Sequence, residues 1–132
     1  MKSIIQNIVS LLAGLMFINA GLNKFFHYMP IPDDLPEQVV NMNAAMAEIG
    51  WLLPLVAIAE IAGGMLFIIP RFRTLGAIVL FPVMIGIILI HLTVAPSGLP
   101  IAVAIFLVLL WAMYDQREKY LYLVKMDSLQ KN

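Results

Sequence analysis

Four long apolar runs divide the chain, and polar or turn-forming residues separate them. The runs cover about residues 4–22, 51–69, 75–94 and 99–114. An α-helix needs about 20 apolar residues to cross the hydrocarbon core of a bilayer, so the first three runs approach spanning length and the fourth is short. The pattern predicts an all-α fold, a four-helix transmembrane bundle, followed by a tail of mixed charge over residues 115–132.

The link between the first two runs has a periodic pattern of its own. Val39, Met42, Met46 and Ile49 recur at helical spacing and form one apolar stripe, and Asp34 is placed to cap a helix that runs toward Gly50. We therefore predict a short amphipathic helix that lies on the membrane surface or over the mouth of the bundle. A plain tether, whose stripe merely avoids water, is the alternative that periodicity leaves open.

Composition agrees with a membrane protein and removes several classes of function. Of 132 residues 62% are hydrophobic and 12% charged, which is too little polar surface to coat a water-soluble globule. Eight basic and eight acidic residues cancel, so no basic field for nucleic acid exists. The chain has no cysteine, which excludes disulfides, thiolate metal sites and CxxC redox chemistry within it. Any redox role therefore needs a bound cofactor or a partner.

The basic residues predict how the bundle is oriented. Lys24 is the only one of the eight Lys and Arg residues on the side of the first link, and the other seven lie on the side of both termini. By the positive-inside rule both termini are cytoplasmic, and the acidic first link is outside. The first run is long for a signal peptide and lacks the small-x-small cleavage pattern, so we interpret it as a retained span. Residues 1–132 then form a single multi-pass domain in a bacterial-type cytoplasmic (inner) membrane.

Few polar side chains interrupt the spans, and these are the candidates for function. Glu60 and His91 lie well inside the second and third runs, and Asn19, Asn23 and Lys24 lie at the end of the first. Ionisable groups at the centre of a span cost about 2.5 to 3.5 kcal/mol on insertion scales and usually face the bundle interior. Helical side chains lean toward their own N-terminus, so the side chains of antiparallel neighbours converge. We predict Glu60 and His91 as catalytic residues and all five as a ligand-binding pocket.

Structural alternatives exist for each of these residues. Glu60 can be a protonated acid bonded to a neighbouring helix, and Asn19 an interhelical clamp. Lys24 can extend to the membrane interface beside the aromatic residues that follow it. Glu60 and His91 leave a three-ligand zinc set incomplete, and bis-histidine haem would need a second buried histidine, because His27 lies in the link. We therefore predict no metal site.

Three stretches of the chain resemble a known family. These are "AGLNKFF" at residues 20–26, "PLVAIAEIAGGMLFIIPRFRTLGAI" at 54–78 and "LIHLTVAPSG" at 89–98. Together they resemble the DoxX/DoxD-like family of small four-helix integral membrane proteins, over about residues 8–114. The resemblance implies an association with redox work, because the family name comes from a quinone-reducing thiosulfate oxidoreductase and other relatives are linked with thiol or oxidative-stress systems. Relatives that act through cysteine are no guide to this chain.

Three functions stay open at this point. In the first, the protein is a quinone-interacting subunit of a membrane oxidoreductase, in which His91 and Asn19 or Asn23 bind the quinone carbonyls and Glu60 exchanges a proton. That function implies a soluble or membrane-bound redox partner and no covalently bound cofactor. In the second, it is a small transporter or permeability factor that uses Glu60 and works as an oligomer. In the third, it is a non-catalytic membrane anchor or assembly factor. Whether the chain is itself an enzyme stays open.

Overall fold

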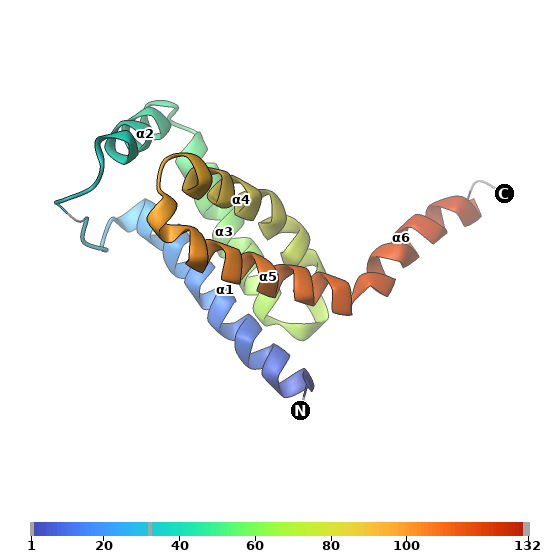
Figure 1. Ribbon diagram of the computed structural model, residues 1–132. Helices are drawn as coiled ribbons and strands as arrows, with labels where there is room; N and C mark the ends of the chain where they lie inside the picture. The colour runs from blue at the N-terminus through green and yellow to red at the C-terminus, as the bar shows by residue number, and fades with distance from the viewer. Residues whose placement is uncertain (1, 32, 131–132) are drawn as a thin grey trace.

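The apolar runs fold as long helices in the computed structural model of the protein, which describes residues 2–31 and 33–130 (Figure 1). Met1, Pro32 and the last two residues of the predicted tail lie outside the described residues. The helices are α1 (Lys2–Phe26), α2 (Glu37–Glu48), α3 (Leu52–Ile68), α4 (Arg73–Thr93), α5 (Leu99–Asp115) and α6 (Arg117–Gln130), with the short 3₁₀ turns η1 (Pro70–Phe72) and η2 (Pro96–Gly98).

Four of these helices form the predicted bundle. Within the described residues three segments are long and apolar enough to cross a membrane, namely Ser3–Phe26, Pro70–Thr93 and Pro96–Asp115. Helix α3 meets the same criterion when it is counted together with α2 as one span that bends by 93°. Alone, the 17 residues of α3 are about 26 Å long, at the short end of spanning length. The all-α bundle with a short helix in the first link is therefore confirmed, and the chain is a multi-pass membrane protein.

The bundle is most tightly packed where its helices carry glycine. A Cβ atom on Gly14 would lie 2.8 Å from the carbonyl oxygen of Gly64, and one on Gly76 would lie 2.5 Å from the amide nitrogen of Phe67. Such distances are shorter than van der Waals contact, so α1 can approach α3, and α3 can approach α4, only because these residues lack side chains. The core beside these contacts consists of the large buried side chains Phe67, Leu80, Met84 and Leu109.

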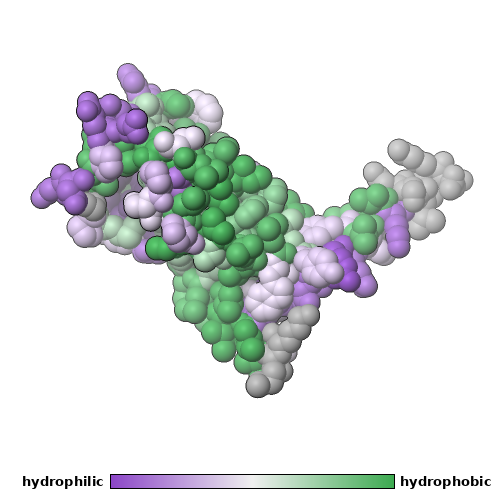
Figure 2. All heavy atoms as spheres, viewed as in Figure 1, coloured by the Kyte–Doolittle hydropathy of each residue, from purple (hydrophilic) through white to green (hydrophobic). Residues whose placement is uncertain are grey.

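The two ends of the bundle differ in shape. In Figure 1, α2 lies across one end, which we call the α2 end, and α6 projects from the opposite end, which we call the η1 end because it also holds η1. Helix α1 begins and α5 ends at the η1 end. In the view of Figure 2, hydrophobic residues cover the side of the bundle, and hydrophilic residues gather around α2 and at the start of α6. This distribution suits a bundle whose flanks face lipid and whose ends face water.

The tail after the fourth span folds as a helix, which its mixed composition did not predict. Tyr120 of α6 is half-buried, and its hydroxyl donates a hydrogen bond of 2.9 Å to the carbonyl oxygen of Thr74 in α4. Burial raises the pKa of Tyr120 above its ordinary value, so the phenol keeps the proton that it donates. This bond fixes the first turn of α6 against the bundle.

The short helix α2 begins later than the Asp34 cap would require. It begins at Glu37, no side chain caps it, and the amides of Val39 and Val40 donate instead to the carbonyl oxygen of Pro36, at 3.0 and 3.2 Å. Proline holds the residue before it in an extended conformation, so a helix cannot start before Pro36. The predicted Asp34 cap is therefore wrong.

The apolar stripe of α2 faces the bundle as predicted, apart from its last residue. Met42 and Met46 are half-buried, whereas Ile49 lies at the helix end and is 46% exposed. The chain then turns at Gly50, which has a φ of +68° and no atom within 4 Å of where a Cβ would be. Only this positive φ, and not crowding, favours glycine at the bend between α2 and α3.

Candidate functional site

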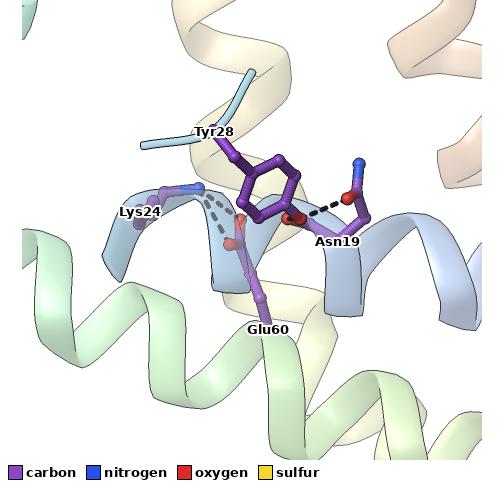
Figure 3. A network of polar contacts seen from close by, with 4 residues as sticks. All are labelled: Asn19, Lys24, Tyr28 and Glu60. Atoms are coloured by element: carbon purple, nitrogen blue, oxygen red, sulfur yellow. Dashed lines mark hydrogen bonds and ion pairs between the residues drawn. The ribbon is translucent and has the colours of Figure 1, made fainter. Parts of the chain in front are cut away.

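Lys24 of α1 and Glu60 of α3 form an ion pair inside the bundle (Figure 3). The Nζ atom of Lys24 lies 2.8 Å from Oε2 and 3.1 Å from Oε1 of Glu60, so it donates to both oxygens. The Glu60 side chain is 2% exposed and that of Lys24 is 26% exposed. A buried carboxylate is costly unless an opposite charge and hydrogen bonds compensate it, and Lys24 supplies both.

Close packing of α1 on α3 brings the two charged residues together. A Cβ atom on Gly21 would lie 2.7 Å from the carbonyl oxygen of Ala57. Gly21 precedes Lys24 by about one turn, and Ala57 precedes Glu60 by about one turn, so the close approach lies directly beside the ion pair. Ala57, Glu60 and Gly64 are all buried and lie on one face of α3.

A cavity of about 680 Å³ adjoins the ion pair at the α2 end. Its walls come from the end of α1, the first half of α3 and the second half of α4, and α2 forms its roof. Most of the lining is aliphatic or methionine, and the polar groups are few. This combination of volume, apolar walls and few polar groups is typical of a small-molecule site. The polar lining residues are Asn23, Lys24, His27, Asn43 and Glu60.

The ion pair lies at the deep end of the cavity, and the roof combines apolar residues with Asn43. Along α3 the lining runs from Leu52 to Glu60, and Glu60 lies roughly 12 Å farther from the roof at a rise of 1.5 Å per residue. Met42 and Met46 of α2 lie at the roof. On the α4 wall, a Cβ atom on Gly86 would meet nothing within 4 Å, so this part of the wall borders open space.

Asn19 and Asn23 fasten the chain where it leaves α1. The hydroxyl of Tyr28 donates to the backbone oxygen of Asn19 at 2.9 Å and also to its side-chain Oδ1 (Figure 3). The Met29 amide donates to Oδ1 of Asn23 at 2.8 Å. The His27 amide donates to the backbone carbonyl of Asn23, and His27 has a φ of 51°. We call this set of bonds the α1 clamp. It ends α1 immediately after Lys24 and folds the chain back along the helix.

The clamp changes the roles expected for the two asparagines. Asn19 is exposed and does not line the cavity, so the structure does not place it beside Lys24 and Glu60 as a lining residue. Asn23 does line the cavity, but its side-chain oxygen is occupied by the Met29 amide, which leaves its Nδ2 group as the donor available to a ligand. The structural alternative, in which Asn19 is an interhelical clamp, differs from what is seen, because among the described residues its side chain bonds to the loop that follows its own helix.

His91 lies apart from the ion pair. Its Nδ1 atom is 2.9 Å from the carbonyl oxygen of Ala95, and a Cβ atom on Gly98 would lie 2.5 Å from its ring carbon Cε1. The neighbouring Ile90 lines the cavity and His91 does not. Within the described residues no hydrogen bond joins His91 to Glu60, so the structure does not bring these two predicted residues together. The turn after α4 offers His91 a carbonyl acceptor, and the ring packs there.

Sequence reasoning missed two polar lining residues, His27 and Asn43. His27 reaches the cavity because the chain reverses at its positive φ, a conformation that the sequence does not indicate for histidine. Asn43 follows Met42 in α2, and Met42 belongs to the apolar stripe from which α2 was predicted. That stripe could have indicated that residues next to it also line the cavity. Lys24 was predicted as a ligand residue, and its pairing with Glu60 removes the alternative in which it extends to the interface.

A second cation, Arg73, is buried at the η1 end. Arg73 is 2% exposed, and its Nε donates to the carbonyl oxygen of Phe67 at 3.0 Å. Its Nη2 donates to the carbonyl oxygen of Ile68 at 3.3 Å, and its Nη1 to Oδ1 of Asn7 at 3.1 Å. These carbonyls end α3 and have no partner within the helix, so Arg73 caps α3 and attaches it to α1.

Comparison with known proteins assigns the family. The sequence profile of the DoxX family matches residues 8–93, well over half of the chain, and this region includes every residue that lines the cavity. The match ends before η2, whereas the resemblance of the sequence extended to about Tyr114. No curated protein and no solved structure matches the chain. The chain thus belongs to the DoxX family of membrane proteins.

Proposed function

We propose that the protein is a quinone-interacting subunit of a membrane oxidoreductase system and that the cavity at the α2 end is its quinone site. The observation that carries this proposal is the cavity of about 680 Å³, with apolar walls and the Lys24–Glu60 pair at its deep end. A quinone has a flat ring, two carbonyl acceptors and an apolar tail. Aliphatic walls suit the ring and tail, and the polar end offers donors for a carbonyl, so the residues fit this ligand.

Lys24 is the residue that would hold a quinone carbonyl. An ammonium group has three donors, and the two oxygens of Glu60 accept two of them. The third donor, together with Nδ2 of Asn23, is available to a ligand at the deep end. Lys24 thus takes the role that the sequence suggested for His91.

Glu60 is the residue that would take up and release protons at the site. When bound, a quinone supplies two-electron, two-proton redox chemistry. Glu60 lines the same cavity, and Lys24 holds the opposite charge beside it, so a proton can move on or off the carboxylate next to a fixed cation. The chain contains no cysteine, so a soluble or membrane-bound partner protein has to deliver or remove the electrons.

The packing of the η1 half favours a binding site over a path through the bundle. Phe67, Leu80 and Leu109 are buried there and fill the interior of a single copy. Transport through one copy would require these side chains to move apart. We also propose that both termini lie in the cytoplasm of a bacterial-type inner membrane, and the bias of basic residues toward the η1 end supports this orientation.

Ligand content tests the proposal directly. The protein is extracted from native membranes into lipid nanodiscs, and quinone is quantified per protein by mass spectrometry of an organic extract. We expect bound quinone in the wild type and at least a tenfold loss in Gly86→Leu, which fills open space at the α4 wall. The matched control is Leu89→Phe, which adds volume on an exposed position of the same helix, 55% exposed, and should keep the ligand. A wild type without quinone, or an unaffected Gly86→Leu variant, contradicts the proposal.

Electron transfer tests the role of Glu60 separately. Glu60→Gln keeps the shape of the side chain but removes its proton exchange, and general acid–base catalysis typically contributes 10² to 10⁴-fold. We expect electron transfer to quinone in membranes to fall by about 10²-fold while quinone content falls less. His91→Gln should leave both quantities unchanged, because His91 lies outside the cavity. Unchanged electron transfer in Glu60→Gln would favour a non-catalytic anchor.

A further inference from the structure

A second hollow lies between α1 and α5, outside the set of residues that line the cavity. It has a volume of about 240 Å³, and every residue that lines it is apolar. Ala13 of α1 and Ala104 of α5 are the small residues in its walls, and Leu12 and Met16 border it while being 63% and 39% exposed. The first and last spans of the bundle therefore leave an open apolar groove on the flank that faces lipid.

Asn19 continues the same face of α1 beyond the groove. It follows Met16 by three positions and Leu12 by seven, which places the three residues on one side of the helix. The 25 residues of α1 are about 37 Å long, against about 30 Å for the hydrocarbon core. If α1 is centred in the membrane, Asn19 lies roughly 7 Å inside the hydrocarbon, and it is exposed there.

The hydrogen-bonding capacity of the Asn19 amide is only partly used. Its Oδ1 accepts from the Tyr28 hydroxyl, and its Nδ2 donates to the Sδ atom of Met29 at 3.5 Å, a weak acceptor. Among the described residues the Asn19 side chain makes these two bonds, so one N–H and one oxygen lone pair remain. Lipid tails cannot satisfy either group, which makes an exposed amide unfavourable in hydrocarbon.

We propose that this face, formed by Leu12, Met16 and Asn19 of α1 together with the groove beside α5, is the interface of a homodimer. A carboxamide both donates and accepts, so two copies of Asn19 can bond to each other across a twofold axis. The protruding Leu12 of each copy packs toward the groove of the other, where Ala13 and Ala104 leave room for close approach. A lipid chain would fill the groove but would leave the Asn19 amide unsatisfied.

Site-specific crosslinking tests the interface with Asn19 intact. The chain has no cysteine, so Leu12→Cys or Met16→Cys introduces the single thiol of the protein. After oxidation in native membranes we expect disulfide-linked dimers from one or both variants. The controls Ile58→Cys on α3 and Leu89→Cys on α4, at positions that are 58% and 55% exposed, should give at least tenfold less dimer. Equal yields from the control and test positions would indicate random collisions and would overturn the proposal.

A measurement of dimer affinity isolates the amide. In lipid bicelles, Asn19→Leu should raise the dimer dissociation constant by about tenfold, since interhelical hydrogen bonds contribute about 1 to 2 kcal/mol in model peptides. Thr93→Val is the matched control, because the Thr93 hydroxyl is also exposed but donates to the Leu89 carbonyl of its own helix at 2.8 Å. Tyr28→Phe, which removes the clamp bond and keeps the amide, should also still dimerise. A wild type that stays monomeric, with or without a retained lipid, would overturn the proposal.

Discussion

Lys24 at the α2 end and Arg73 at the η1 end are both cations held inside the bundle, but their surroundings differ. Lys24 pairs with the carboxylate of Glu60 at the edge of a cavity. Within the part of the chain that the structure describes, Arg73 bonds to neutral oxygens, two carbonyls at the end of α3 and the side chain of Asn7, in the close-packed half of the bundle. One cation thus faces open space and an opposite charge, and the other completes a helix end.

The difference indicates which buried charge is tied to function. Arg73 satisfies carbonyl groups that the end of a helix leaves without partners, so packing and hydrogen bonding account for it fully. The Lys24–Glu60 pair requires the desolvation of two charges, and well-packed apolar residues of similar volume often give equal or greater stability. Stability alone therefore does not explain the pair, which is why we propose a ligand and a proton at the adjoining cavity.

The largest expected effect comes from breaking the ion pair on one side. Lys24→Met leaves the buried carboxylate of Glu60 without its partner and should lower the free energy of unfolding by about 3 to 5 kcal/mol in lipid bicelles. The double variant Lys24→Met with Glu60→Leu should recover most of that loss and should still fail to retain quinone. If the double variant is as unstable as the single one, the ion pair serves stability, and Lys24 no longer differs from Arg73 in this respect.

A smaller effect should distinguish the packing of the two ends. In Gly76→Ala the new Cβ would lie 2.5 Å from the Phe67 amide nitrogen, and such overpacking typically costs about 1 to 3 kcal/mol. In Gly86→Ala the new Cβ meets open space, and alanine in a helix should raise the free energy of unfolding by about 0.5 to 1 kcal/mol. Both variants lie in α4, so each is the control for the other. Equal losses would mean that the α2 half is as tightly packed as the η1 half.

The fold was largely predictable because length and hydropathy determine spanning helices. The second run was predicted over residues 51–69 and the helix is Leu52–Ile68. The first run was predicted to end near residue 22, yet α1 continues to Phe26, because Lys24 finds its partner in Glu60 across the bundle. Helix α6 was missed since its mixed charge gives no apolar period, and its bond from Tyr120 to Thr74 is a long-range contact.

The candidate site was only partly predictable, for a reason that lies in the helices themselves. Lys24 and Glu60 were recognised because charged groups in a span are costly wherever they point. The placements of Asn19 and His91 depend on how a helix is rotated about its axis, and a helix that is apolar on all sides carries no pattern to indicate that rotation. Glycine contacts between helices instead determine how the helices are rotated, and the Ala95 carbonyl determines where the His91 ring packs.

The smallest expected effect concerns the α1 clamp and would sharpen the contrast between the two cations. Arg73 is held by the helix that it caps, whereas Lys24 lies in the last turn of a helix that is fastened by side chains of the following loop. Tyr28→Phe removes the hydrogen bonds to Asn19 and should lower the free energy of unfolding by about 1 kcal/mol. Hydrogen exchange of the Met29 amide, which donates to Asn23, should accelerate, while that of the Phe72 amide in η1, which donates to Ile69, should stay unchanged. Unchanged exchange at Met29 would mean that α1 ends after Lys24 without help from the clamp, and that both cations are fixed by their helices alone.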